Sequence, residues 1–483
     1  MKPYLFLTFL FWSSLATGQT PFQPFEVDSA AEPRGGMVFL NTFIQACLRK
    51  PVPAQAAGVG GRVILEGVVE PNGQITDVKV MQRFRPDCDR EAIRVFKLFN
   101  AWKPALKNGQ AVRQRVMIPV IFQANPPFTY LNGARITYFG ADNKVTSDST
   151  QAKYKQLAPI DTNGVSAGDV VVYEAKSKGW KEYYRMPLVH RKNSKPTTNQ
   201  KITYTVGNQN FKQDWEGTLY LLDEAGTIIN QSFYQDGKPT GSELSYHANG
   251  CIAQKKDEST DRTAYMNWYA NGQIKQIKAV SKTSPLVKVE PELVTAFWDS
   301  TGHQQIVNGN GRAIYHTQVQ SDSDTTKHTL LVEQGQYQDG LKQGVWTGRN
   351  QDGSYFYEEA YDKGICQSGK AQSASADTVR YTTVMQHPEF KGGMQGLGQF
   401  LSQNLKYPAE AQKAGAQGRV FISFVVCTDG TLCDYEVLKG VQSDLDREAV
   451  RVVQQMSGKW RPGVQRGQKV RVKYNLPINF TLN

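Results

Sequence analysis

The chain has few of the residues that build metal centres and catalytic sites. Its 483 residues include six histidines and six cysteines, and the histidines show none of the short spacings that zinc ligands use. No glycine-rich, phosphate-binding loop opens a helical stretch. Carboxylates are scattered, and no pair suited to acid-base chemistry stands out. The sequence therefore predicts no metal, no cofactor and no enzyme.

One short motif has the spacing of a hydrolase site. The run GVSAG at residues 164–168 fits a nucleophile elbow, which needs a strand before it and a helix after it. Here the apolar run at residues 169–173 follows, and such a run is typical of a strand. We interpret the motif as a polar loop, with Ser166 in no catalytic role.

Long apolar runs are also scarce, and the one that stands out lies at the start of the chain. Lys2 precedes an apolar stretch at residues 4–15, and Ala16 and Gly18 supply the small residues that a signal peptidase accepts. The stretch is shorter than the roughly 20 residues that cross a bilayer. We predict a signal peptide at residues 1–18 and an exported, periplasmic protein. An uncleaved N-terminal membrane anchor is the alternative.

Acidic residues are outnumbered, since 44 Asp and Glu stand against 56 Lys and Arg, which gives a net charge of +12. The basic residues are dispersed and the chain is predicted to be exported, so we expect no nucleic-acid partner. The charge favours anionic envelope surfaces or acidic partners. With 40% apolar residues, the chain is typical of folded soluble proteins and long enough for three or more folded units.

The cysteines are too few for a disulfide-dense scaffold in a chain of this length. Cys88 falls on the apolar stripe of a predicted helix, where it is interpreted as a small core residue. Cys427 and Cys433 flank a predicted turn and occupy diagonal positions of one hairpin. A bridge between them is left open, because disulfides have strict geometric requirements.

The chain contains two copies of one unit, near its two ends. A shift of 357 positions aligns residues 35–37 with 392–394 and continues without a gap into the second predicted helix. After one inserted residue the match resumes. Equivalent residues include Gly61 and Gly418, Gly73 and Gly430, Asp89 and Asp446, Trp102 and Trp460, Pro104 and Pro462, and Pro119 and Pro477. We predict a duplicated domain at residues 35–125 and 385–483, which we call the head and the tail.

Each copy is predicted to fold as helix, strand, strand, helix, strand. In the tail, proline at Tyr407-Pro408 interrupts the first helical stretch. A strand at residues 420–426 alternates apolar residues at period two, and Asp429-Gly430 then supplies a turn. Asp444 caps a helix with one apolar stripe. The expected fold class is α+β, with an antiparallel three-stranded sheet and two helices in each domain.

This pattern resembles the TonB C-terminal domain. The family's Tyr-Pro pair, its glycine before the first strand, its Asp-Gly hairpin and its Trp-containing motif before the last strand all recur in the tail. The matching tail residues are Tyr407, Pro408, Gly418, Asp429, Gly430, Trp460 and Pro462. The head keeps Gly61, Gly73, Trp102 and Pro104, but has Pro51-Val52-Pro53 and Asn72-Gly73 where the family has Tyr-Pro and Asp-Gly. These residues are expected to be structural.

The middle of the chain is predicted to be repetitive. Residues 19–34 are expected to be a linker and residues 126–200 a connector. From residue 201 to 367, glycine pairs nine residues apart and aromatic strands recur, which is typical of stacked β-hairpins. This region resembles the MORN-type repeats of exported bacterial proteins. The small, polar segment 368–384 is predicted to link the repeats to the tail.

The resemblance implies recognition rather than catalysis. In the TonB family, an edge strand of this domain takes up a short peptide of an outer-membrane receptor as an added strand. The expected edge comprises Lys469, Val470, Arg471, Val472, Lys473, Tyr474, Asn475 and Leu476. The expected function is binding of outer-membrane transport receptors or other envelope proteins, assisting energy transduction and transport. The resemblance would add the proton-driven inner-membrane motor as a second partner.

Two other interpretations remain open. The alternating residues of the last strand would merely fill the core, with its lysines preventing edge aggregation. Alternatively, the protein is an envelope scaffold that binds peptidoglycan, polysaccharide or other proteins through its repeats. The sequence does not distinguish these alternatives and does not predict an oligomeric state.

Overall fold

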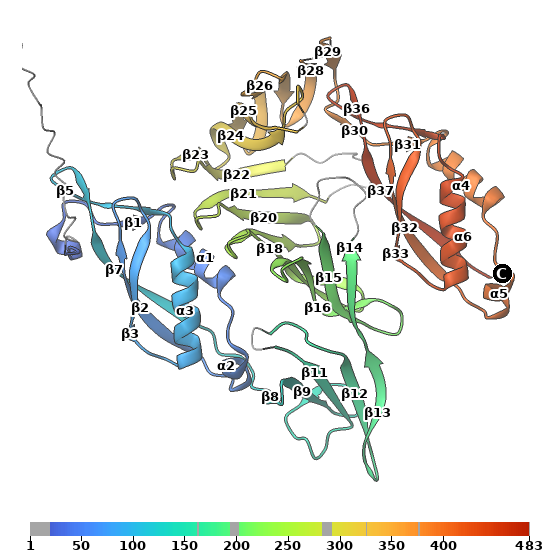
Figure 1. Cartoon of the computed structure of the whole chain (residues 1–483), viewed down its shortest axis with the longest axis horizontal. Coiled ribbons are helices and arrows are strands. Elements are labelled where there is room, and N and C mark those ends of the chain that lie inside the picture. Colours follow the sequence, from blue (N-terminus) through green and yellow to red (C-terminus); the bar gives the residue numbers. More distant parts are fainter. Residues whose placement is uncertain are drawn as a thin grey trace, which may run out of the picture. The chain divides into compact units, whose positions relative to one another are not determined.

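The computed structural model of the protein describes residues 20–161, 164–193, 202–282, 292–324, 326–374 and 377–482 (Figure 1). The predicted signal peptide, residues 1–18, lies outside the described residues. Backbone contacts divide the chain into two compact units, one with residues up to 50 and 59–124, the other with residues 51–58 and from 125 onwards. No helix in the described part is long and apolar enough to cross a membrane.

The first unit is the head, and it has the predicted α+β fold. Its antiparallel sheet has the order β3-β2-β7. Helix α3 packs against β2 and β3, and α1 packs on α3. Every second residue of β7 is buried, because alternate side chains of a strand share one face. The elements are α1 (Met37–Cys47), β2 (Gly61–Val69), β3 (Ile75–Gln82), α3 (Pro86–Leu98) and β7 (Gln114–Phe122).

The boundaries of the head differ from the prediction. The segment 19–34, predicted as a linker, contains the 3-10 turn η1 (Pro24–Glu26) and the strand β1 (Glu32–Pro33), which pairs with β4 (Trp102–Lys103). Backbone hydrogen bonds hold this segment against the rest of the domain. Amino-acid composition does not predict such bonds. Residues 51–58 group with the second unit. There they form α2 (Val52–Ala56), and the Ala56 carbonyl accepts a 3.1 Å hydrogen bond from the Phe128 N–H.

The tail repeats the arrangement of the head, with the sheet order β33-β32-β37. Helix α6 packs against β32 and β33. The core of the tail consists of the apolar stripe of α6, the inward-facing residues of the sheet, and Trp460. The elements are α4 (Gly393–Asn404), α5 (Ala409–Lys413), β32 (Gly418–Val426), β33 (Leu432–Lys439), α6 (Ser443–Gln454) and β37 (Val472–Phe480).

Both domains contain a small hairpin before the last strand that was not predicted. In the tail it joins β35 (Gly463–Gln465) to β36 (Gln468–Val470), and in the head β5 (Ala105–Lys107) to β6 (Gln110–Val112). The tail hairpin also pairs with β30 (Met385–Gln386), while β31 (Glu389–Phe390) pairs with β34 (Trp460–Arg461). At the tail turn both residues have positive φ, 48° at Arg466 and 78° at Gly467, as a two-residue type I′ turn requires.

The predicted connector, residues 126–200, contains a folded sheet. Its strand order is β10-β9-β11-β12-β13, with β8 paired to β9. The motif GVSAG at residues 164–168 lies between β11 and β12, so a strand follows Ser166, as the sequence indicates. The strands are β8 (Thr129–Leu131), β9 (Ala134–Phe139), β10 (Val145–Thr146), β11 (Tyr154–Pro159), β12 (Val170–Lys176) and β13 (Gly179–Met186).

The repeat region is one antiparallel sheet of 16 strands in strictly sequential order, from β14 to β29. The strands are β14 (Leu188–Asn193), β15 (Thr203–Gln209), β16 (Trp215–Asp223), β17 (Ile228–Gln235), β18 (Lys238–Tyr246), β19 (Ile252–Glu258), β20 (Arg262–Trp268), β21 (Ile274–Ser281), β22 (Glu292–Trp298), β23 (Gln304–Val307), β24 (Asn310–Gln320), β25 (His328–Gln338), β26 (Leu341–Asn350), β27 (Tyr355–Asp362), β28 (Ile365–Ser373) and β29 (Val379–Tyr381).

Residues 201–367 were predicted as stacked β-hairpins, and the structure joins the hairpins of this region into one continuous sheet. The hairpins exist, but each also pairs with its neighbours through backbone hydrogen bonds, because an unpaired strand edge is costly. Pairing begins at Leu188 and continues to Tyr381. The predicted linker at residues 368–384 therefore contains the end of β28 and all of β29 among its described residues. Small, polar side chains are typical of linkers, but they do not prevent strand pairing, because the hydrogen bonds between strands use only backbone groups.

Candidate functional site

The outer strand of the tail sheet, β37, is the candidate site. All nine of its residues pair with β32 in an unbroken register, from Val472 opposite Val426 to Phe480 opposite Gly418. On its other side β37 has no partner strand among the described residues of the chain. An edge of this kind presents unpaired backbone donors and acceptors, onto which an extended peptide can add.

The head shows which backbone groups of β37 face outward. There the Arg115 N–H donates to the Phe22 carbonyl at 2.9 Å, although Arg115 lies within the ladder between β2 and β7. Its N–H therefore points away from β2. Lys473 is the tail equivalent of Arg115, and backbone groups alternate in direction along a strand. The N–H groups of Lys473 and Asn475 thus face outward.

Pro477 independently supports this assignment. It lies opposite Phe421 in the ladder, two residues beyond Asn475. Proline has no N–H, so within sheets it is confined to edge positions where the missing donor would face solvent. The head has proline at the same place, since Pro119 lies opposite Ile64. The outward donors of β37 are therefore followed by a residue that cannot donate.

The structure divides the predicted edge into two parts. Val472, Lys473, Tyr474, Asn475 and Leu476 lie on β37, while Arg471 connects β36 to β37. Lys469 and Val470 lie on β36, where they pair with Val464 and Gly463. The sequence reading extended the edge too far, because the turn at Arg466-Gly467 folds this segment back into a hairpin. The candidate edge begins at Val472.

The basic side chains near this edge are paired with acidic ones. The Arg471 guanidinium contacts the Asp434 carboxylate at 2.9 Å, and the Lys473 ammonium lies 3.5 Å from Glu436. Both acidic residues belong to β33. Arg471 and Lys473 therefore offer little unpaired positive charge to an incoming peptide, because each already has a carboxylate partner.

The equivalent edge of the head is partly occupied by the chain itself. Phe22 forms a parallel bridge with Gln114, at the start of β7. Its N–H donates to the Arg113 carbonyl and its carbonyl accepts from the Arg115 N–H, both at 2.9 Å. The Gln114 amide oxygen also accepts from the Ala31 N–H at 2.7 Å. The head and the tail therefore differ in what their edges offer.

The family-motif residues have structural roles in the tail. The Tyr407 hydroxyl donates to the Ala416 carbonyl, and its ring packs edge-on against Phe480 at 5.8 Å. Pro408 precedes α5 as its N-cap. A Cβ atom added at Gly418 would lie 2.8 Å from the Val441 side chain. These contacts hold the short helix against the sheet.

Trp460 and Gly430 form a second structural contact. The Trp460 ring packs between Phe424, Phe390 and Tyr474, with ring centroids 4.9–5.6 Å apart. Gly430 has φ of 83°, and a Cβ atom there would lie 2.3 Å from the Trp460 carbonyl oxygen. The head repeats the contact: Gly73 has φ of 81°, and a Cβ atom there would lie 2.4 Å from the Trp102 carbonyl oxygen. Asp429 bonds to Thr431 within the turn. Pro104 and Pro462 each follow the short strand that carries the tryptophan.

We expect Gly430→Ala to destabilise the protein by about 2–4 kcal/mol, because it combines a strained positive φ with a clash against a backbone oxygen. Gly458→Ala is the matched control. Gly458 also has positive φ, 79°, but a Cβ atom there meets nothing within 4 Å, so we expect about 1–2 kcal/mol. Urea unfolding of both variants measures the difference. Equal losses would contradict the proposed contact.

Sequence analysis missed a polar network that both copies share. In the tail, the Glu448 carboxylate accepts the Lys406 N–H at 2.6 Å and binds Arg451, which donates to the Asn404 carbonyl at 2.7 Å. In the head, Glu91 and Arg94 make the same contacts with Arg49 and Cys47. The identical spacing in the two copies was the available signal. The network satisfies backbone groups at the end of the first helix, a structural need.

A second missed residue is Arg466, at the turn of the β35–β36 hairpin. Its side chain is only 15% exposed, and its Nε atom lies 2.7 Å from the fully buried Glu359 carboxylate of β27. Its guanidinium stacks 3.6 Å from the ring centroid of Tyr357. The hydroxyls of Tyr361 and Tyr381 also donate to Glu359, both at 2.9 Å. The head has Asn108 at the equivalent position, so this contact belongs to the tail alone.

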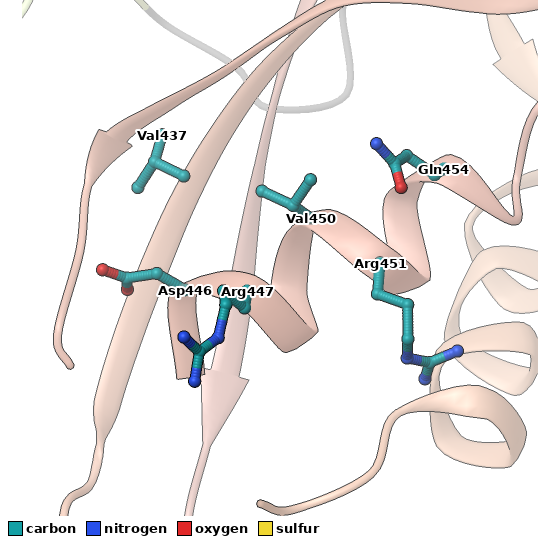
Figure 2. Close-up of a pocket in the computed structure, with 6 residues that line it drawn as sticks. All are labelled: Val437, Asp446, Arg447, Val450, Arg451 and Gln454. Carbon is teal, nitrogen blue, oxygen red and sulfur yellow. The ribbon is translucent and has the colours of Figure 1, made fainter. Parts of the chain in front are cut away.

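A shallow hollow of 270 Å³ lies between β33 and α6 of the tail (Figure 2). Its lining residues are Val437, Asp446, Arg447, Val450, Arg451 and Gln454. Both of its arginines have carboxylate partners on the same helix, Asp444 for Arg447 and Glu448 for Arg451. The Asp446 carboxylate accepts the Val441 N–H at 2.9 Å. Each charged side chain that lines the hollow therefore already has a partner within the tail domain.

The described residues contain no cluster of three or more His, Cys, Asp or Glu side chains arranged for a metal ion. We assign no catalytic or metal-binding role to any residue of the site.

The two domains match a known family, as the sequence predicted. The sequence model of the Gram-negative bacterial TonB protein C-terminal matches residues 51–124 and 403–482, together under half of the chain. The head and the tail are therefore TonB C-terminal domains, and the chain carries two copies. No curated protein matches the chain.

Solved structures give weaker similarities. Two solution structures of the Helicobacter pylori TonB C-terminal domain are each 24% identical to this chain. The first covers 19% of this chain and 80% of its own length, with a TM-score of 0.17. The second covers 18% of this chain and 91% of its own length, with a TM-score of 0.16. A dihydro-heme d1 dehydrogenase is 10% identical over 80% of this chain and 75% of its own, with a TM-score of 0.13. Scores this low carry no argument.

Proposed function

We propose that the tail domain binds extended segments of outer-membrane transport receptors by adding them as a strand to β37, in a periplasmic protein that assists TonB-dependent transport. The observation that carries this proposal is the set of outward N–H groups at Lys473 and Asn475, on an edge that lacks a partner strand among the described residues. Two copies of the TonB C-terminal domain support the same role.

The head supplies a template for the first contacts of such a peptide. Phe22 satisfies the outer backbone groups of Arg113 and Arg115 with one carbonyl and one N–H. Arg471 and Lys473 are the equivalent residues of the tail. An incoming residue would accept from the Lys473 N–H and donate to the Arg471 carbonyl in the same way. Affinity would come mainly from these main-chain hydrogen bonds, as is usual for strand addition.

The template also assigns different roles to the two domains. Because Phe22 already occupies the start of the β7 edge, we assign peptide binding to the tail and not to the head. The 16-stranded sheet would serve as a platform for the tail, which Arg466 holds against β27. The proposed function includes no catalytic step and no cofactor. A motor-coupled form of the protein is not part of the proposal.

The test is a titration of the intact protein with synthetic peptides from receptor plug regions, followed by calorimetry. We expect saturable 1:1 binding. The control is the same peptide N-methylated at alternate residues, which removes the donors needed for strand addition but keeps every side chain. Equal affinity for both peptides would contradict the proposal. Salt-sensitive binding of acidic polysaccharide, without any peptide binding, would instead support the envelope-scaffold alternative.

A further inference from the structure

Two cysteines of the tail lie together at the hairpin that precedes α6. Cys427 directly follows β32 and Cys433 lies on β33, in diagonal positions, since Val425 is the register partner of Cys433. Their sulfur atoms are 2.7 Å apart, closer than unbonded sulfur atoms normally approach. Both side chains are partly exposed, so reagents in solution can reach them.

The head has different residues at this position. There, Glu70 and Thr76 replace the two cysteines. The Thr76 hydroxyl donates to the Glu70 carboxylate at 2.5 Å, and the same carboxylate binds Arg113 at 2.9 Å. Arg113 in turn contacts Asp77 at 3.2 Å. This quartet joins the hairpin to the start of the last strand through hydrogen bonds and ion pairs.

The tail retains half of this quartet. Arg471 and Asp434 are equivalent to Arg113 and Asp77, and they form an ion pair at 2.9 Å. Asp434 has φ of 56° and Asp77 has φ of 49°, so the backbone of the two hairpins is alike. The Arg471 guanidinium also contacts the Cys433 sulfur at 3.3 Å. Only two positions of the quartet differ: Glu70 and Thr76 of the head are replaced by Cys427 and Cys433 in the tail.

We propose that Cys427 and Cys433 are a redox-active dithiol that oxidises to an intramolecular disulfide, the covalent counterpart of the contact between Glu70 and Thr76 in the head. Replacement of a single member would break the hydrogen bond, whereas replacement of both by cysteine creates a new bond at the same place. The disulfide would staple the hairpin beside the residue that leads into β37. This inference does not depend on peptide binding.

The oxidation needs a disulfide donor, such as oxidised glutathione or the active-site disulfide of a thiol oxidoreductase. The Cys427 thiolate attacks the donor and forms a mixed disulfide, and one donor sulfur leaves as a thiol. The Cys433 sulfur then loses its proton and attacks Cys427, which releases the second donor sulfur. The protein loses two electrons and two protons, and the donor gains both.

The environment of Cys433 has opposing effects on its thiolate. Burial, with the neighbouring Cys427 thiol as a further cause, raises the pKa of Cys433 to about 11, so it remains protonated at neutral pH. The Arg471 guanidinium beside its sulfur opposes this effect and would stabilise the thiolate as it forms. The reaction balances with either sulfur as the first attacker, and the product is the same disulfide.

The test uses the intact protein, incubated with oxidised glutathione, alkylated without reduction and digested with trypsin. Cys427 and Cys433 lie on one tryptic peptide, residues 420–439. We expect this peptide to be two hydrogens lighter and unalkylated, and to gain two alkyl groups once it is reduced first. Of six cysteines, four would remain as thiols under denaturing titration.

Cys366 provides an internal control, because it is also partly exposed and lies on a separate peptide. It should be alkylated without reduction. The variant Cys433→Ser should convert Cys427 to a mixed disulfide with glutathione, whereas Cys366→Ser should leave the bridge intact. Two alkyl groups on peptide 420–439 after oxidation, or glutathione on either cysteine of the wild-type protein, would overturn the proposal.

Discussion

Replacement of Arg466 by Ala is expected to destabilise the docking of the tail on the 16-stranded sheet by about 3–5 kcal/mol. Removal of the guanidinium leaves the Glu359 carboxylate, which has no exposed surface, without its cation. Breaking a buried ion pair from one side costs more than the pair contributes, because the remaining charge stays out of water. The loss of stacking on Tyr357 adds to the effect.

The tyrosines around Glu359 cannot replace the missing charge. Burial raises the pKa values of Tyr361 and Tyr381, so both hydroxyls remain neutral donors to the carboxylate. Burial lowers the pKa of Arg466, but its hydrogen bond to Glu359 and its electrostatic interactions with Glu359, Tyr357 and Tyr355 together outweigh burial, so the pKa is raised. Arg466 therefore stays charged at every physiological pH.

Hydrogen exchange of the intact protein would measure the change. We expect faster exchange in the β35–β36 hairpin and in β29 for Arg466→Ala, while β32 and α6 remain protected. Arg461→Ala is the matched control, since Arg461 is 74% exposed and lies 3.6 Å from Glu389. Such a pair contributes about 0–1 kcal/mol.

A second variant tests the cause of the expected loss. Adding Glu359→Gln to Arg466→Ala removes the unpaired charge, and the amide oxygen can still accept from Tyr361 or Tyr381. We expect this double variant to recover part of the protection. If Arg466→Ala exchanged like the wild-type protein, the hairpin contact would have no role in holding the tail.

Asn475→Pro is expected to weaken peptide binding at least about tenfold, equivalent to about 1.4 kcal/mol. The substitution removes one of the two outward donors of β37. The ladder with β32 should survive, because the lost N–H faces away from it, as that of Pro477 would. Residue 474 is already extended in β37, which is the conformation that a following proline favours.

Asn475→Ala is the matched control, because it removes the same exposed side chain and keeps the N–H. We expect its peptide affinity to stay within about twofold of the wild-type value, since the affinity comes from the backbone. Thermal unfolding of both variants checks that the fold is kept. A folded Asn475→Pro protein with unchanged affinity would move the binding site away from β37. Val472→Pro would be a poor test, because the Val472 N–H faces β32.

Much of the fold of the two domains follows from local pattern. Period-two alternation in the strands, the apolar stripe of α6 and the glycine turns all indicate their elements, because each depends on residues close in sequence. The repeat of these signals after 357 positions identified the duplication, and the TonB C-terminal family model matches both copies. The short strands and the connector sheet escaped notice, because their pairing uses backbone groups and their side chains show no clear period.

Local sequence pattern predicted only part of the candidate site. Residues 472–476 were predicted as an edge, but Lys469 and Val470 fold back into a hairpin. Which N–H groups face outward became clear only from the bond between Arg115 and Phe22, which are far apart in sequence. The pairing of Phe22 with the edge of the head sheet was likewise not predictable from local sequence, because Phe22 and β7 are far apart along the chain.

By itself, the sequence determined that this protein has two related α+β domains, where their main helices and the three strands of each central sheet lie, and that Gly73 and Gly430 make the turns between the first two of these strands. Only the tertiary structure decided which edge has a neighbour, and that Arg466 meets Glu359 across 107 positions of chain. The physical reason is that periodicity and turn chemistry act between close neighbours. Strand partners and buried ion pairs, in contrast, depend on which distant segments the folded core brings together.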